Sequence, residues 1–277
     1  MKIRHLISIL VVITTLYSCK NASNEPVINP LEGLTKLKEG YVIGAAVKFE
    51  LWGKKIFFVG YNNLTVVLYD SLNLKVKITD AHIHFTPVVS IGNGASVIEQ
   101  ASPVENPNEV PVNDVFPGAV SFIKASDSTD SWKLGIAVHN HKYDKEGEVV
   151  FDITVDNSAS SLVKTFTSTS ADSTRFVLTL VKPTTPKEGL NDIEFLLNTE
   201  TVSLLDWTTD DSYMVEINTE MQDMWYSSHS FILTKNIGNG HYTGSFDFSM
   251  KGEWRINVNI KQNGVLLSQN LYFTLNI

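Results

Sequence analysis

The chain has 277 residues, 43% of them hydrophobic, which is enough for one large domain or two ordinary domains with normal cores. Its 22 Lys and Arg face 30 Asp and Glu, and the net charge of −8 excludes the basic surface that nucleic acids or anionic lipids require. The one cysteine excludes an intramolecular disulfide, so the core alone must stabilise the fold.

Residues 1–18 have the composition of an export signal. Two cations precede the apolar run Leu6–Leu16, which is shorter than the ~20 residues of a membrane-spanning helix. The run ends at Leu16-Tyr17-Ser18-Cys19, which resembles the lipobox of bacterial lipoproteins, although Tyr17 stands where a small residue is usual. The resemblance implies that the signal is removed and that Cys19 takes a diacylglycerol anchor.

The residue after the cysteine bears on localisation. Lys20 replaces the Asp that marks inner-membrane retention in well-known lipoproteins, so we expect an outer-membrane lipoprotein on its periplasmic or surface face. Residues 19–38 are rich in Asn and Pro and are predicted to be the lipidated cysteine and a tether. An ordinary secretory signal with a chance cysteine is the alternative.

Alternating apolar and polar residues recur along the rest of the chain. In Arg255–Lys261, three apolar side chains would share one face of a strand, and similar runs cover 64–69, 133–138, 149–155, 175–181 and 193–197. Asn263-Gly264 lies between two such runs and predicts a hairpin, because both residues tolerate positive φ. No long stretch has helical spacing. We therefore predict an all-β protein.

Three motifs occur twice in the same order, which predicts two copies of one domain. The motif pairs are Gly60-Tyr61-Asn62 with Gly189-Leu190-Asn191, Phe116-Pro117-Gly118 with Tyr242-Thr243-Gly244, and Trp132 with Trp254. We predict a first β-sandwich at 39–156, a linker at 157–173 and a second β-sandwich at 174–277. Within the linker, Leu162, Val163 and Phe166 could also form a strand. The spacing of the strands is typical of two tandem immunoglobulin-like sandwiches.

The second copy also resembles a known family. The motifs are Gly189-Leu190-Asn191, Glu220-Met221 with Met224, Phe248-Ser249-Met250-Lys251-Gly252 and Trp254. They are similar to the YtkA-like and FixH-like domains of bacterial envelope proteins. The resemblance implies a small β-sandwich that is often found beside heavy-metal handling systems. The first copy lacks the methionines.

Met221 and Met224 are followed by His229 in the second copy. Thioethers are soft ligands for Cu(I), and imidazole binds copper in either oxidation state. The three residues are therefore predicted to form a copper site. The alternative is that both methionines are flexible core filler.

A second candidate metal site consists of His82 and His84, two residues apart in a predicted strand. Side chains at i and i+2 share a face and lie about 7 Å apart, so both rings could bind one metal. If Ile83 faces the core, both histidines face outward. His139 and His141 repeat the pattern in a later strand. The alternative for each pair is a solvated polar face, and this is the interpretation that we prefer.

No sequence motif of an enzyme stands out. The chain has no Gly-x-Ser-x-Gly elbow, no phosphate-binding glycine loop and no His-Glu-x-x-His helix. We therefore expect a non-enzymatic binding module of the cell envelope, held to the membrane by its lipid, with copper or another heavy metal as its expected ligand. The alternative is a structural or adhesive module that docks another envelope protein and has no metal site.

Overall fold

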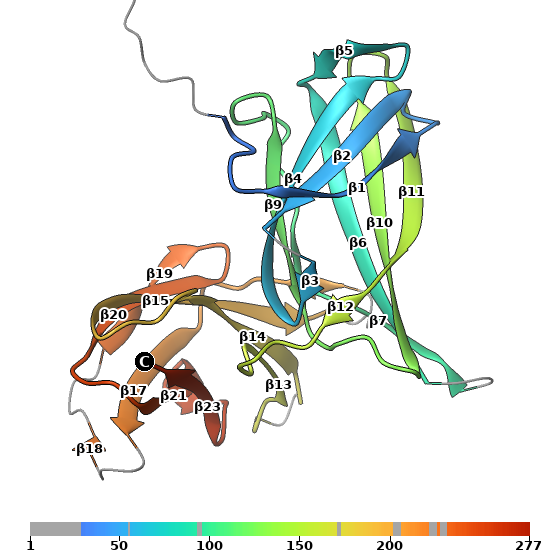
Figure 1. Cartoon of the computed structure of the whole chain (residues 1–277). Helices are drawn as coiled ribbons and strands as arrows, with labels where there is room; N and C mark the ends of the chain where they lie inside the picture. The colour runs from blue at the N-terminus through green and yellow to red at the C-terminus, as the bar shows by residue number, and fades with distance from the viewer. Residues whose placement is uncertain are drawn as a thin grey trace, which may run out of the picture.

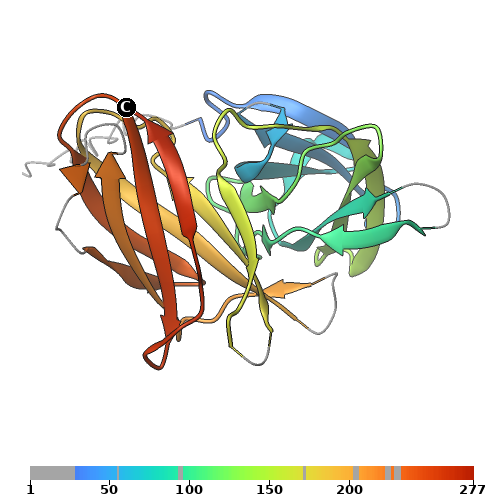
Figure 2. The same ribbon diagram turned by 90° about the horizontal axis from the view of Figure 1, so that it is seen from below.

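The computed structural model describes residues 29–277, except 55, 93–95, 171–172, 202–205, 222–225 and 228–231. All elements in this part of the chain are strands, 23 in number, which confirms the prediction of an all-β protein. The strands form two bodies that lie side by side (Figures 1 and 2), each with its own hydrophobic cluster. None of the described residues belongs to a helix that could cross a membrane.

The first body contains twelve strands in two main sheets. Their bounds are β1 Thr35–Val42, β2 Val47–Gly53, β3 Phe57–Phe58, β4 Gly60–Asp70, β5 Asn73–Ile78, β6 Ala81–Ile91, β7 Ile98–Ala101, β8 Val104–Glu105, β9 Phe116–Phe122, β10 Asp130–Asn140, β11 Lys145–Ile153 and β12 Val155–Asp156. One sheet has the order β1-β2-β4-β9-β8, with β5 beside β4, and the other has the order β11-β10-β6-β7. The short strands β3 and β12 pair in parallel.

The second body contains the remaining strands. Their bounds are β13 Val163–Thr167, β14 Arg175–Lys182, β15 Gly189–Glu200, β16 Trp207–Thr208, β17 Met214–Met221, β18 Tyr226–Ser227, β19 Ile232–Gly238, β20 His241–Phe248, β21 Glu253–Gln262, β22 Val265–Leu266 and β23 Leu271–Asn276. The main order is β13-β14-β15-β20-β19-β17-β21-β22. Because β19 pairs with both β20 and β17, it links the strands β13-β14-β15-β20 to the strands β17-β21-β22.

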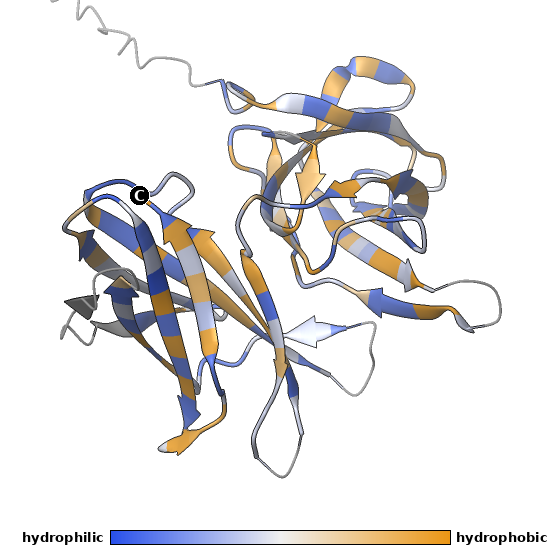
Figure 3. Cartoon of the chain, turned by 60° about the horizontal axis from the view of Figure 1, so that its bottom comes forward, coloured by the Kyte–Doolittle hydropathy of each residue, from blue (hydrophilic) through white to orange (hydrophobic). Residues whose placement is uncertain are grey.

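Apolar and polar residues alternate along the strands, as the banding in Figure 3 shows. The apolar side chains fill the two hydrophobic clusters. In β21, Ile256, Val258 and Ile260 are at most 2% exposed, whereas the residues between them are partly exposed. The predicted hairpin is also present, because Asn263 and Gly264 adopt positive φ between β21 and β22.

The segment 157–173, predicted mainly as a linker, contributes a strand to the second body. β13 pairs with β14 through five residues. Leu162 and Phe166 pack against the second hydrophobic cluster, and the ring of Phe166 stacks on Phe176 at 5.0 Å. The second body therefore begins upstream of Thr174, because residues in and beside β13 pack against its core. The sequence pattern predicts this strand only as an alternative to a linker.

The two bodies share a pairing register that follows the sequence motifs. Gly60 of β4 pairs with Phe122 of β9, and Gly189 of β15 pairs with Phe248 of β20. Further along the same strands, the pairs are Leu64 with Gly118 and Val66 with Phe116 in the first body, and Ile193 with Gly244 and Phe195 with Tyr242 in the second. Residues that match in the two motifs thus occupy equivalent places in the two sheets.

An asparagine performs the same local function at the start of β4 and of β15. The Asn62 amide donates to the carbonyls of Phe58 and Gly60, both at 2.8 Å, and its oxygen accepts from the Phe58 amide. Asn191 makes the same three bonds to the carbonyls of Lys187 and Gly189 and to the Lys187 amide. In each body the asparagine side chain thus supplies hydrogen-bond partners to backbone groups at the start of the strand.

Candidate functional site

The predicted copper site is only partly within the described residues. Met221 is there, at the end of β17, and its side chain is 5% exposed and belongs to the second hydrophobic cluster. Its methyl group is so close to Gly252 that a Cβ on that glycine would lie 2.1 Å away. Met221 therefore has the core-packing role given above as the alternative. Met224, His229 and Cys19, the predicted site of lipidation, lie outside the described residues, so their predicted roles stay predictions.

Four histidines, His82, His84 and His139 in strands and His141 just after β10, lie together on the outer face of the first body. His82 and His84 of β6 point outward, as predicted, because Ala81, Ile83 and Phe85, which alternate with them, are buried in the core. β10 is the antiparallel neighbour of β6, and His139 pairs directly with His82. Sequence reasoning kept the two pairs apart, whereas the sheet joins them. Among the described residues, no three His, Cys, Asp or Glu side chains already form a group that could hold a metal ion.

A polar network that the sequence did not predict connects the two bodies. His241 begins β20, and its Nε2 lies 2.7 Å from Oε1 of Glu105, which ends β8 of the first body. Its Nδ1 lies 2.8 Å from Oε1 of Glu194 in β15. The Tyr61 hydroxyl donates to the other Glu105 oxygen, and Lys182 pairs with the other Glu194 oxygen at 2.7 Å. The network therefore runs from β4 to β14 across the boundary.

The carboxylates of this network favour the protonated form of His241. Burial by itself disfavours the imidazolium, but the hydrogen bonds and charges of Glu105 and Glu194 outweigh it and raise the His241 pKa. Carboxylates only accept, so an imidazole with both N–H groups satisfies both of them. Burial raises the Glu105 pKa, but the hydrogen bonds from His241 and Tyr61 lower it by more than burial raises it. The net shift of the Glu105 pKa is downward. The junction thus favours an imidazolium between two carboxylates.

A second bond across the boundary comes from Trp207 in β16. Its indole N–H donates to the Ala101 carbonyl, at the end of β7, over 2.8 Å. β4 and β14 also contact each other directly. The two bodies are therefore fixed to each other by contacts at more than one place.

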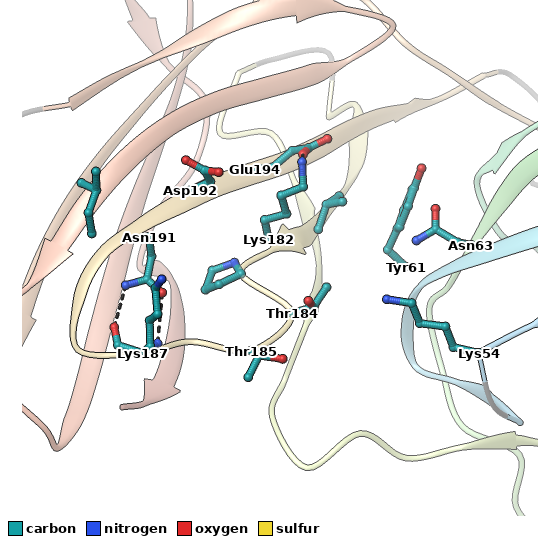
Figure 4. A pocket seen from close by; sticks show the side chains of 13 residues that line it. Lys54, Tyr61, Asn63, Lys182, Thr184, Thr185, Lys187, Asn191, Asp192 and Glu194 are labelled. Carbon is teal, nitrogen blue, oxygen red and sulfur yellow. Dashed lines mark hydrogen bonds and ion pairs between the residues drawn. The ribbon is translucent and has the colours of Figure 1, made fainter. Parts of the chain in front are cut away.

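An open cavity of ≈ 540 Å³ lies beside this network, with walls from both bodies (Figure 4). The first body contributes Lys54, Tyr61 and Asn63. The second body contributes Val181, Lys182, Pro183, Thr184, Thr185, Lys187, Leu190, Asn191, Asp192 and Glu194. In Figure 4 the ammonium of Lys182 approaches Glu194, whereas Lys54 extends from the opposite wall. Ammonium, hydroxyl, amide and carboxylate groups thus share the lining with the apolar side chains of Val181, Pro183 and Leu190.

Sequence reasoning missed the junction because its members are far apart in the chain. Glu105 and His241 are separated by 136 positions. One signal was nevertheless present, since the alignment of the repeats places His241 at the position of Val115 in the first copy. Val115 is 4% exposed. An ionisable residue at a position that is apolar and buried in the other copy indicates that the surroundings of the second copy differ there.

Comparisons with known proteins match the second body. A family model described as YtkA-like matches residues 170–259. No curated protein sequence matches the chain. Among solved structures, the crystal structure of a DUF4785 family protein from Legionella pneumophila is similar with 9% identity and a TM-score of 0.27. The match covers 79% of this chain and 54% of that chain, so this chain spans about half the length of that protein.

Proposed function

We propose that the protein is a membrane-anchored lipoprotein of the bacterial envelope that acts as a non-enzymatic binding module. The match of residues 170–259 to a YtkA-like family model supports an envelope role. The apolar leader that ends at Cys19 supports the anchor, and Lys20 supports an outer-membrane location. The acidic net charge of −8 supports a partner other than a nucleic acid.

The proposal includes two copies of one immunoglobulin-like sandwich. The shared strand register, the paired roles of Asn62 and Asn191 and the buried Trp132 and Trp254 support a common architecture. Even the indole bonds correspond, since Trp132 donates to the Lys124 carbonyl and Trp254 to the Met250 carbonyl, both at 3.0 Å.

The cavity at the junction is the observation that carries the binding role. Both bodies build it, and the network around His241 holds its walls in one arrangement. Preorganised concave sites bind with less loss of entropy than surfaces that must first assemble. The charged and hydroxyl-bearing lining suits a small hydrophilic ligand or a polar segment of a partner protein.

A cavity-blocking variant tests this role. Thr184→Trp places an indole at the cavity, and Lys145→Trp, on the exposed strand β11, is the control. Thermal unfolding is measured with a panel of sugars, carboxylates and phosphates. We expect a ligand at about 100 times its Kd to stabilise the parent and the control by about 2.7 kcal/mol and the blocked variant much less. Equal stabilisation of the blocked variant, or no stabilisation by any compound, would contradict the proposal.

The anchor has its own test. Cys19→Ser is expected to abolish lipidation, because only the thiol forms the diacylglycerol thioether, and the variant should leave the membrane pellet on a carbonate wash. Ser18→Ala serves as the control for changes near the cleavage site. Retention of Cys19→Ser in the pellet at the parent level would show that another feature holds the protein there.

Copper binding and a structural or adhesive role are the two remaining parts of the functional hypothesis. Copper binding stays a prediction that concerns Met224 and His229, because the Met221 side chain is enclosed in the core. A structural or adhesive role is the second candidate. It is favoured by Ile43 and Leu72, which are 88% and 93% exposed in two turns that a bond from the Ser71 amide to the Ala46 carbonyl connects. Such exposed apolar groups suit contact with another protein.

A further inference from the structure

We propose that the outer face of β6 and β10 binds a divalent transition-metal ion, with His82, His84, His139 and His141 as its ligands. This site belongs to the first body and is separate from the junction cavity and from the predicted methionine site. It therefore adds a function to the binding module and does not depend on the role of the cavity.

Four of the seven histidines in the chain meet on this face. The ring centroids of His82 and His84 are 5.9 Å apart, those of His82 and His141 are 5.8 Å apart, and those of His139 and His141 are 4.9 Å apart. His82 and His139 are direct cross-strand partners. The cluster thus consists of His82 and His84 on β6, His139 near the end of β10 and His141 in the turn that follows β10.

The backbone beneath the cluster is fixed. Ile83 and Phe85 on β6 and Val138 on β10 are 1%, 4% and 2% exposed, and they hold both strands against the first core. A ligand set on rigid strands keeps its spacing, and only the side-chain torsions need to adjust when a metal binds.

Each ring already has a polar partner that can orient it. His82 Nε2 lies 2.7 Å from Glu109, His139 Nε2 lies 3.1 Å from Asp144, and His141 Nδ1 lies 2.6 Å from Asp80. His84 Nδ1 lies 3.1 Å from the Asn106 amide nitrogen. In metal sites, a carboxylate on one ring nitrogen fixes the tautomer and makes the other nitrogen a better ligand. The face therefore carries the supporting groups as well as the four imidazoles.

The free ring nitrogens do not yet point at one place, because the rings stand tilted or edge-on to one another. The side chains of His82, His139 and His141 are 48%, 40% and 27% exposed, so solvent leaves them room to rotate. A bound metal would turn the rings toward itself. Imidazole is a ligand of intermediate softness, and a set of several imidazoles favours Cu(II), Ni(II) and Zn(II) over Mg(II) or Ca(II).

The experiment is a titration of the full chain, purified in detergent without an affinity tag, with Zn(II) and with Cu(II). The test variant is His82→Ala with His139→Ala, which removes one ligand from each strand. The matched control is Thr86→Ala with Lys133→Ala, because these residues are exposed further along the same two strands. We expect saturable binding by the parent and the control, and binding weaker by on the order of 100-fold in the test variant. Circular dichroism checks that both variants are folded.

A spectroscopic measurement identifies the ligands. The electron paramagnetic resonance spectrum of the Cu(II)-loaded chain should show coupling to several imidazole nitrogens, and this coupling should be lost in the test variant. The proposal is overturned if the parent takes up neither ion below millimolar concentration, or if the test variant binds as the control does.

Discussion

Trp254→Ala is expected to lower the free energy of unfolding of the second body by about 3–5 kcal/mol. The indole is 0% exposed, and its ring contacts those of Phe246 and Phe248 at 5.7 and 5.4 Å. Truncation leaves a large cavity, and it removes the donor to the Met250 carbonyl. Urea titration of the full chain, followed by far-UV circular dichroism, measures the change.

The first body supplies a matched variant. Trp132 is 1% exposed and has the same type of ring contact, 5.1 Å from Phe122, so Trp132→Ala should cost a similar amount in the first body. Leu72→Ala is the surface control, with an expected change within about 0.5 kcal/mol. A Trp254→Ala chain that unfolds at the same urea concentration as the parent would show that this ring does not organise the second core.

His241→Ala is expected to loosen the junction and to remove its pH dependence. The charged groups that face His241 are Glu105 from β8 and Glu194 from β15, with Tyr61 and Lys182 at the two ends of the network. Loss of the imidazolium leaves two facing carboxylates without their shared donor. Breaking a buried pair costs about 3–5 kcal/mol, and we expect about 2 kcal/mol here because the Glu105 side chain is 29% exposed.

The direction of the pH effect follows from the raised pKa of His241. The contribution of the imidazolium to the docked state is complete below about pH 6.5, the ordinary pKa of histidine, and it is lost as the pH rises through the raised value. The parent should therefore lose stability on alkalinisation from pH 6.5, whereas His241→Ala should lack this step. His84→Ala in metal-free buffer is the control. Thermal unfolding and small-angle scattering against pH measure both effects, and an identical profile for parent and His241→Ala would refute the role of this network.

The strands and the matching registers of β4 and β15 could be predicted because both follow local patterns. Alternation of side chains fixes which face of β21 is buried, and the matched motifs fix equivalent registers in β4 and β15. The position of Met221 was also predictable from the same rule. It continues the series Val215, Ile217 and Thr219, every second residue of β17, and all four are buried.

The junction and the histidine cluster could not be predicted, because each depends on which strands become neighbours. Nothing in the local sequence of Glu105 indicates that His241 lies beside it. The two His-x-His pairs were visible, but only the antiparallel register of β6 and β10 places His139 opposite His82. The local sequence shows which side chains carry functional groups, whereas the order and register of the strands determine how far apart two side chains lie.

The asparagine at the start of β4 and of β15 gives a pattern by which distant relatives can be sought. Two of its three hydrogen bonds in each body are donated by the side-chain amide, so aspartate, which has no such donor at neutral pH, cannot replace it. The glycine two residues before it adopts a positive φ of 134° in one copy and 91° in the other, which disfavours other residues there. Divergence of this domain is therefore restricted at two fixed places, and a glycine, any residue and an asparagine before an alternating strand should remain recognisable in sequences whose cores have been repacked.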